Sequence, residues 1–271
     1  MAPVRVKFDP ADHAVQVEAC LATVMDPELD EAVTELGFIT EVELLGAGAV
    51  RIGFRLPTYW CAANFAFLMA DDMRRAVQAL PWVNQVQVQL HEHMYAEAIN
   101  AGVASGGGFQ AAFGAAAEGG LEALRRTFLV KAFQRRQEAL LQHLLDAGYE
   151  AGALVVMDRY ALLRLGLDAE GEHLLGRYLQ RRNQAGDGPL AFVDSDGQAI
   201  ASVELSGYLR GLRRVGVNAE FNGALCRGLL AVRDGAQPTE SGTEPQTEPQ
   251  MKPKAQPIHF MRQPAERVAI S

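Results

Sequence analysis

The residue with the clearest capacity for chemistry in this sequence is Cys61. It follows a strand-like run that ends at Leu56 and precedes an amphipathic helical pattern that starts near Phe65. A thiol at a helix N-terminus lies close to the positive end of the dipole and to unpaired amides, which favour the thiolate. Thiolate binds iron or attacks persulfide sulfur, and Thr58 is placed to donate a hydroxyl hydrogen bond to it. The alternative is a buried cysteine that acts as a small apolar side chain.

An acidic run precedes the first predicted strand and consists of Asp26, Glu28, Asp30, Glu31 and Glu35. A solvated loop with capping aspartates is one interpretation of this run. The chemical alternative is that Asp26 and Glu28 face Cys61 and help it to hold a hard or borderline metal ion.

The other cysteines and two histidines carry weaker signals. Three cysteines far apart in the chain do not make a disulfide framework, and their spacing does not fit zinc. Cys226 falls in an apolar helical stretch, which favours core packing. His91 and His93 end a predicted strand two residues apart and could bind a transition metal, but they share that strand's glutamine face, which favours a solvated role.

The elements that would position Cys61 form a predicted α/β unit over residues 9–95. Asp9 and Pro10 open a helix. Strands follow at 38–45 and 50–56 around a Gly-Ala-Gly turn, then a helix that Pro81 stops, then a strand with alternating valines and glutamines. The order helix, strand, strand, helix, strand predicts an α+β fold, with a small mixed sheet and its helices on one face.

Three further segments follow this unit. Residues 96–119 are rich in glycine and alanine and predict a linker, and residues 120–234 predict a mainly α-helical second domain. The expected helices are a long one from Leu121 to Gly148 and shorter ones at Leu162–Leu167, Leu174–Leu179, Leu205–Leu212 and Leu225–Leu230. Residues 235–271 contain a Pro/Gln/Glu/Thr-rich stretch that predicts a disordered tail.

Composition excludes several classes of function. The chain has 271 residues, 49% of them hydrophobic, and a net charge of −8. A negative balance argues against nucleic acid and against anionic membranes. No secretory signal or spanning segment is evident, so we expect a cytoplasmic protein. No nucleophile–base pair, phosphate loop or dinucleotide fingerprint occurs in the sequence, so we expect that the protein is not an enzyme.

Four motifs occur in order within MDPELDEAVTELGFITEVEL, VRIGFRLPTYWCAANF and LPWVNQVQVQL. They are Asp26-Pro27-Glu28, an acid-Leu-Gly step at Glu35, a Thr-containing turn that ends in Cys61, and a Leu-Pro-x-Val close. This combination resembles the iron–sulfur cluster assembly domain family, which includes SufT, PaaD-like proteins and a cytosolic cluster-targeting factor. The resemblance covers residues 11–93.

The resemblance implies an accessory factor for maturation of a metalloenzyme. Cys61 would handle iron or an iron–sulfur cluster transiently, with Thr58, Asp26 and Glu28 in support, and the helical domain would dock a client metalloenzyme. Proteins with this fusion resemble accessories of multicomponent di-iron monooxygenases, and a homodimer could pair two Cys61 thiols. The second hypothesis is a non-catalytic adaptor or assembly chaperone in which Cys61 is structural.

Overall fold

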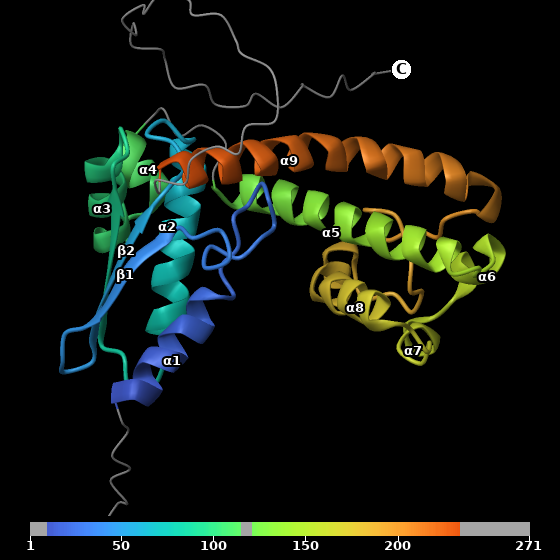
Figure 1. The fold of residues 1–271 in the computed structure, drawn as a ribbon, viewed down its shortest axis with the longest axis horizontal. Coiled ribbons are helices and arrows are strands. Elements are labelled where there is room, and N and C mark those ends of the chain that lie inside the picture. Colours follow the sequence, from blue (N-terminus) through green and yellow to red (C-terminus); the bar gives the residue numbers. More distant parts are fainter. Residues whose placement is uncertain (1–9, 115–120, 234–271) are drawn as a thin grey trace, which may run out of the picture. The chain divides into compact units, whose positions relative to one another are not determined.

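The structure is a computed structural model that describes residues 10–114 and 121–233. Its N-terminal part contains five elements in the predicted order: α1 (Pro10–Leu21), β1 (Ile39–Leu44), β2 (Ala49–Arg55), α2 (Ala63–Gln78) and β3 (Gln85–His91). Strand β2 lies in the middle of the sheet, antiparallel to β1 and parallel to β3 (Figure 1). The mixed sheet predicted from the sequence is therefore confirmed.

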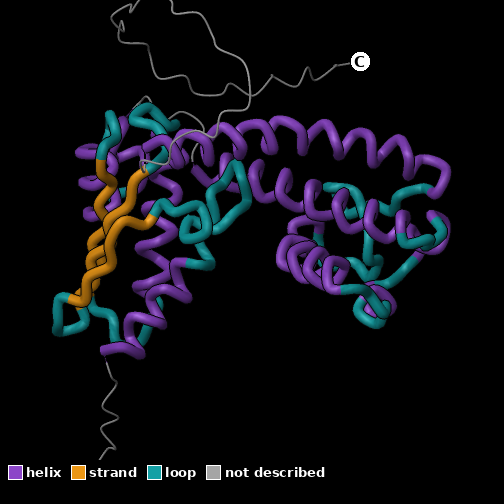
Figure 2. The backbone as a smooth tube through the Cα atoms, viewed as in Figure 1, coloured by secondary structure: helices purple, strands orange, loops and turns teal. Residues whose placement is uncertain are grey.

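The sheet buries one face and leaves the other open. Val50, Ile52 and Phe54 of β2 have no exposed surface, and α2 packs against β3 on the same side. The glutamines of β3 alternate with buried residues and are exposed, and an ion pair between Arg51 and Glu43 lies on the open face at 2.6 Å. This alternation of buried and exposed residues explains why the helices pack on one face of the sheet, as predicted. Figure 2 shows the three strands together in the N-terminal part.

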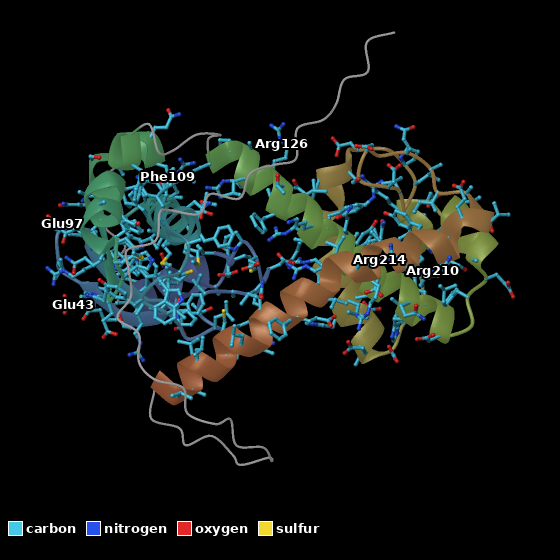
Figure 3. The ribbon with its side chains drawn as sticks, turned by 90° about the horizontal axis from the view of Figure 1, so that it is seen from above. Glu43, Glu97, Phe109, Arg126, Arg210 and Arg214 are labelled. Carbon is cyan, nitrogen blue, oxygen red and sulfur yellow. The ribbon has the colours of Figure 1, made fainter. Side chains whose placement is uncertain are left out.

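The predicted linker is wrong for residues 96–113, which form α3 (Ala96–Ser105) and α4 (Gly108–Phe113). Phe109 of α4, labelled in Figure 3, is 6% exposed. Its ring meets the ring of Phe67 of α2 edge-on, with centroids 5.5 Å apart. A Cβ on Gly102 would lie 2.6 Å from Ala112 and 3.0 Å from Phe67. Glycine here permits close packing of helices, and its abundance was misread as flexibility.

The rest of the described chain is helical, as predicted. It contains α5 (Leu121–Asp146), α6 (Ala151–Val156), α7 (Arg159–Leu162), α8 (Ala169–Arg182) and α9 (Leu205–Arg233), with 3₁₀ turns at Asn183–Ala185 and Ser202–Glu204. The long helix α5 ends before Gly148, whose φ of +91° stops it as expected. None of the helices in this part or the other described part is long and apolar enough to cross a membrane.

The prediction of two short helices at Leu205–Leu212 and Leu225–Leu230 is wrong, because both ranges belong to the single helix α9. It is continuous over 29 residues and lies along α5 (Figure 1). Each internal glycine costs a free helix about 1 kcal/mol relative to alanine, but packing offsets that cost. Gly216 is buried, and a Cβ there would lie 3.9 Å from Arg135 of α5. The predicted helix at Leu162–Leu167 is also displaced, because α7 ends at Leu162. The predicted tail, residues 235–271, lies outside the described residues.

Asp30 of the acidic run joins the two parts of the fold. Its side chain is 4% exposed and accepts Arg136 Nε at 2.5 Å and Arg181 Nη2 at 3.1 Å. Arg177 Nη2 lies 3.7 Å from the carboxylate and donates to the Asp30 carbonyl at 3.0 Å. The three arginines come from α5 and α8, so the helical part holds the acidic run through a buried charge cluster. The solvated-loop interpretation is therefore wrong for Asp30.

Replacing Asp30 by asparagine should strongly destabilise the protein, because three guanidinium groups would lose their carboxylate without any change in volume. Removing one partner of a buried ion pair costs about 3 kcal/mol or more. Urea unfolding of Asp30→Asn measures this loss. The matched control is Glu220→Gln, which breaks an exposed pair with Arg213 at 2.9 Å and should cost less than about 1 kcal/mol. Equal effects of the two substitutions would contradict the role assigned to Asp30.

Candidate functional site

Cys61 lies in the turn between β2 and α2, two residues before the helix begins at Ala63. Its side chain is half-buried. Its amide donates to the Thr58 carbonyl at 3.5 Å, so Thr58 shapes the turn through its main chain. The strand-to-helix position predicted for Cys61 is the one that the structure shows.

His93 fixes this turn from the other side. It is 5% exposed, and its Nε2 lies 2.9 Å from the Cys61 carbonyl, while Nδ1 accepts the Tyr95 amide at 3.1 Å. Because Nδ1 accepts a hydrogen bond, Nε2 must carry the ring proton, and it donates a hydrogen bond to the Cys61 carbonyl. Burial lowers the pKa of His93, which keeps the ring neutral. The sequence missed this role because it placed His93 on the solvated glutamine face.

His91 and His93 do not form a pair. Glu92 between them has a φ of +49°, which ends the strand alternation and turns His93 inward. His91 stays on the open face of the sheet, 45% exposed and 3.8 Å from Glu41. The metal-binding alternative for the two histidines has no support from this geometry.

Asp26 is buried at the base of the acidic run. Its Oδ1 accepts the amides of Glu28 at 2.9 Å and Leu29 at 2.7 Å, and its own amide donates to the Glu31 carbonyl. Burial, followed by the charges of Glu28 and Glu31, raises the pKa of Asp26 to about 6 despite the two amide bonds. The carboxylate therefore holds the loop in shape and is also one of the negative groups around Cys61.

The surroundings of Cys61 favour the thiol over the thiolate. Burial raises the pKa of Cys61 to about 12, and the charges of Asp26, Cys226 and Glu28 act in the same direction. The amide of Ala62 at the helix start lowers it but is outweighed. The predicted resting thiolate is therefore wrong.

Cys226 is the site residue that the sequence did not identify. It is half-buried on α9, and burial, Asp26 and Glu28 all raise the pKa of its thiol. The same carboxylates therefore affect the thiols of Cys226 and Cys61, whereas the sequence analysis placed Cys226 in a core. Among residues 10–114 and 121–233, no group of three or more His, Cys, Asp or Glu side chains is arranged to hold a metal ion.

Comparison with known families gives a match to the N-terminal part of the chain. Residues 14–90 match the family model described as iron–sulfur cluster assembly protein. The match runs from α1 to near the end of β3 and includes Asp26, Glu28, Thr58 and Cys61. The chain thus contains an N-terminal iron–sulfur cluster assembly domain, which supports a role in iron–sulfur cluster handling. The helical part lies outside the match, and a comparison with curated proteins found no match to the chain.

The raised pKa predicts slow alkylation of Cys61 in the folded protein at neutral pH. The loss of thiolate exceeds the gain in nucleophilicity, so Cys61 should react roughly a hundredfold more slowly than an ordinary thiol. Iodoacetamide labelling followed by peptide mass spectrometry measures the rate, which should rise with pH through pH 9 and beyond. In denaturant Cys61 should react like a free cysteine. Equal rates in the folded and unfolded protein would contradict the prediction.

The raised pKa of Asp26 predicts a pH-dependent effect of Asp26→Asn. The folded protein holds this proton more tightly than the unfolded chain, so the associated stability is full below about pH 4 and is lost as the pH rises through about 6. Asparagine keeps the accepting oxygen and carries no charge. The free energy of unfolding of the variant minus that of wild type should therefore rise by up to about 3 kcal/mol between pH 4 and 7. A difference that stays flat across this range would argue against the assignment.

Proposed function

We propose that this protein is an accessory factor in the maturation of a metalloenzyme. The N-terminal domain handles iron or an iron–sulfur cluster through Cys61, and the helical part recognises a client. The observation that carries the proposal is the assembly-domain match over the segment that contains Cys61, Asp26 and Glu28. In this role the protein is a carrier and not an enzyme, and it acts in the cytoplasm, where thiols stay reduced.

The electrostatics of the site suit a cationic cargo. Two carboxylates beside a protonated thiol attract a metal ion, and a metal that coordinates a thiol displaces its proton. Cys61 is thus an inert thiol until iron arrives, and binding releases a proton. Because one thiolate is far fewer than the ~four a cluster normally takes, Cys61 alone supports transfer and not stable storage.

The rim of the site suits a protein partner. Tyr59 and Trp60, directly before Cys61, are 56% and 71% exposed, and Met94 is 45% exposed. The Met94 amide donates to the Tyr59 carbonyl at 2.9 Å, so these side chains belong to adjoining segments. Exposed aromatic residues and methionine are typical of contact surfaces. A client or donor that docks here would come close to the thiol, and a di-iron monooxygenase is the first client to test.

A second candidate is an adaptor or assembly chaperone in which Cys61 is structural. It is favoured by the high pKa of Cys61 and by the lack, in the described residues, of a three-ligand metal group. An adaptor needs the rim and the helical part but not the thiol. The two candidate functions therefore differ in whether the sulfur of Cys61 is required.

Co-expression of a client enzyme with wild type or with Cys61→Ala separates them. Maturation through the thiol predicts that the client's iron content falls with Cys61→Ala to the level found without the accessory. Cys20→Ala, which removes a half-buried thiol of α1, is the matched control and should support full loading. Thermal melts must show both variants folded. If the folded Cys61→Ala variant supported full iron loading of the client, maturation through the thiol would be contradicted and the adaptor would remain as the candidate function.

A further inference from the structure

Helix α9 carries a line of apolar side chains on its solvent-exposed face. Four of them are half or more exposed: Val217 at 50%, Phe221 at 70%, Leu225 at 52% and Val232 at 59%. Each residue of a helix turns by about 100°, so the four side chains lie within a sector of about 80°. A helix with apolar residues on several sides is typical of a position between two neighbours.

The opposite face of α9 is the one that packs within the chain. Its buried positions recur at spacings of three, four and seven residues: Leu205, Leu209, Leu212, Gly216, Gly223 and Leu230. The exposed line repeats at the same spacings. A repeat close to 3.5 residues is typical of a helix that packs along its length against another helix. In the described part of the chain, α9 therefore has one such face that is covered and one that is not.

Two arginines extend the exposed line toward the start of α9. Arg210 and Arg214 are exposed and fall in the same sector as Val217, seven and three residues before it. Figure 3, which looks down on α9, labels both. Among residues 10–114 and 121–233 neither makes an ion pair, unlike Arg213, which pairs with Glu220 at 2.9 Å. The exposed face of α9 thus has a basic end and an apolar end.

Gly228 lies on the exposed line between Leu225 and Val232. A Cβ there would meet nothing within 4 Å, so packing among the described residues does not require a glycine. Alanine would favour the helix by about 1 kcal/mol. A glycine on the outer face of a helix does, however, let a second backbone come close.

We propose that the exposed face of α9 is the docking surface for an amphipathic helix of a partner protein. The partner helix is apolar along one side and carries carboxylates at the end that meets Arg210 and Arg214. Phe221 lies in the middle of the apolar part and is the anchor, because aromatic residues contribute most of the binding energy at such contacts. The inference goes beyond the proposed function and applies to a carrier and to an adaptor alike.

Charge favours a partner protein over other occupants of this face. A second copy of α9 would place arginine beside arginine in a parallel pair. An antiparallel pair centred on Phe221 would place the arginines beside Gly228 and Val232, so both pairings leave the guanidinium groups without counter-charges. An anionic membrane would repel a chain whose net charge is −8. A helix with acidic residues at one end pairs both arginines and covers the apolar line.

A synthetic helix tests the proposal with the full-length protein. The probe is a fluorescent peptide of about three heptads, with leucine at the a and d positions of two heptads and glutamate at those of the third. Two versions place the glutamates in the first or the last heptad and so cover both orientations. One of them should bind, by fluorescence anisotropy, at least about tenfold more tightly than its twin with lysines for glutamates. Equal binding of the twins, or no binding of either version, would overturn the proposal.

Variants of α9 locate the binding site of the probe. Phe221→Ala should weaken binding of the glutamate peptide by at least about tenfold. The matched control is Tyr160→Ala, which removes a ring of α7 that is 68% exposed and should bind as wild type does. Replacing Arg210 and Arg214 by glutamate should reverse the preference in favour of the lysine peptide. All three side chains on α9 are exposed, so the variants should melt as wild type does. Unchanged binding by Phe221→Ala, or no reversal of preference, would contradict the assignment.

Two further measurements exclude the other occupants. Wild type and Phe221→Ala should show the same mass in sedimentation velocity, because the partner is not a second copy. They should also bind equally to vesicles of phosphatidylcholine and phosphatidylglycerol in about equal amounts, because the partner is not a membrane. A dimer that dissociates in Phe221→Ala, or vesicle binding that is lost in it, would overturn the proposal in favour of that occupant.

Discussion

The burial of Asp30 beneath Arg136, Arg177 and Arg181 is the interaction on which the arrangement of the site depends. A lone carboxylate at 4% exposure would be very costly, and so would an unpaired Arg136 at 5%. Each therefore requires the other, which ties α5 and α8 to the acidic run. Asp30 itself has a φ of +55°, a left-handed conformation that costs free energy and persists because these contacts and the turn around Asp26 hold it.

Burial, aided by nearby charges, explains why the Cys61 thiol is protonated. The buried charge cluster at Asp30 holds the acidic run that contains Asp26 and Glu28, whose charges add to the effect of burial. The helix dipole contributes about 0.3–1 kcal/mol, less than the roughly 1.4 kcal/mol of one pKa unit. Burial and the carboxylates raise the pKa of Cys61 to about 12, so their effect is much larger than that of the helix dipole. A thiol at a helix start is thus not sufficient for a thiolate, and its neighbours decide the outcome.

Local patterns predicted the local structure well. Alternation located β2 and β3 to within one residue, and the strand-to-helix step located Cys61 correctly. The main error came from glycine, whose abundance near Gly102 was taken to indicate a linker. At Gly102 glycine instead allows close approach to Ala112. Composition does not distinguish a flexible glycine from a tightly packed one.

The long-range part of the site could not be found in this way. Glu28 and Asn222 are 194 residues apart, and the protonation of Cys61 depends on the loop and helix that contain them. Local periodicity has no information on such pairs. It identified Cys226 as apolar-facing, which is correct for its helix but silent on the neighbour that it meets.

The fused helical part changes what an assembly domain with one thiol can do. It holds the acidic run in a fixed conformation, because Asn222 of α9 donates to Glu28 at 2.8 Å and Arg227 pairs with Glu31 at 2.9 Å. The buried charge cluster at Asp30 and the contact at Glu28 act together, because α9 lies along α5, whose Arg136 binds Asp30 of the same acidic run. Docking of the helical part and the conformation of the acidic run are thus one structural event.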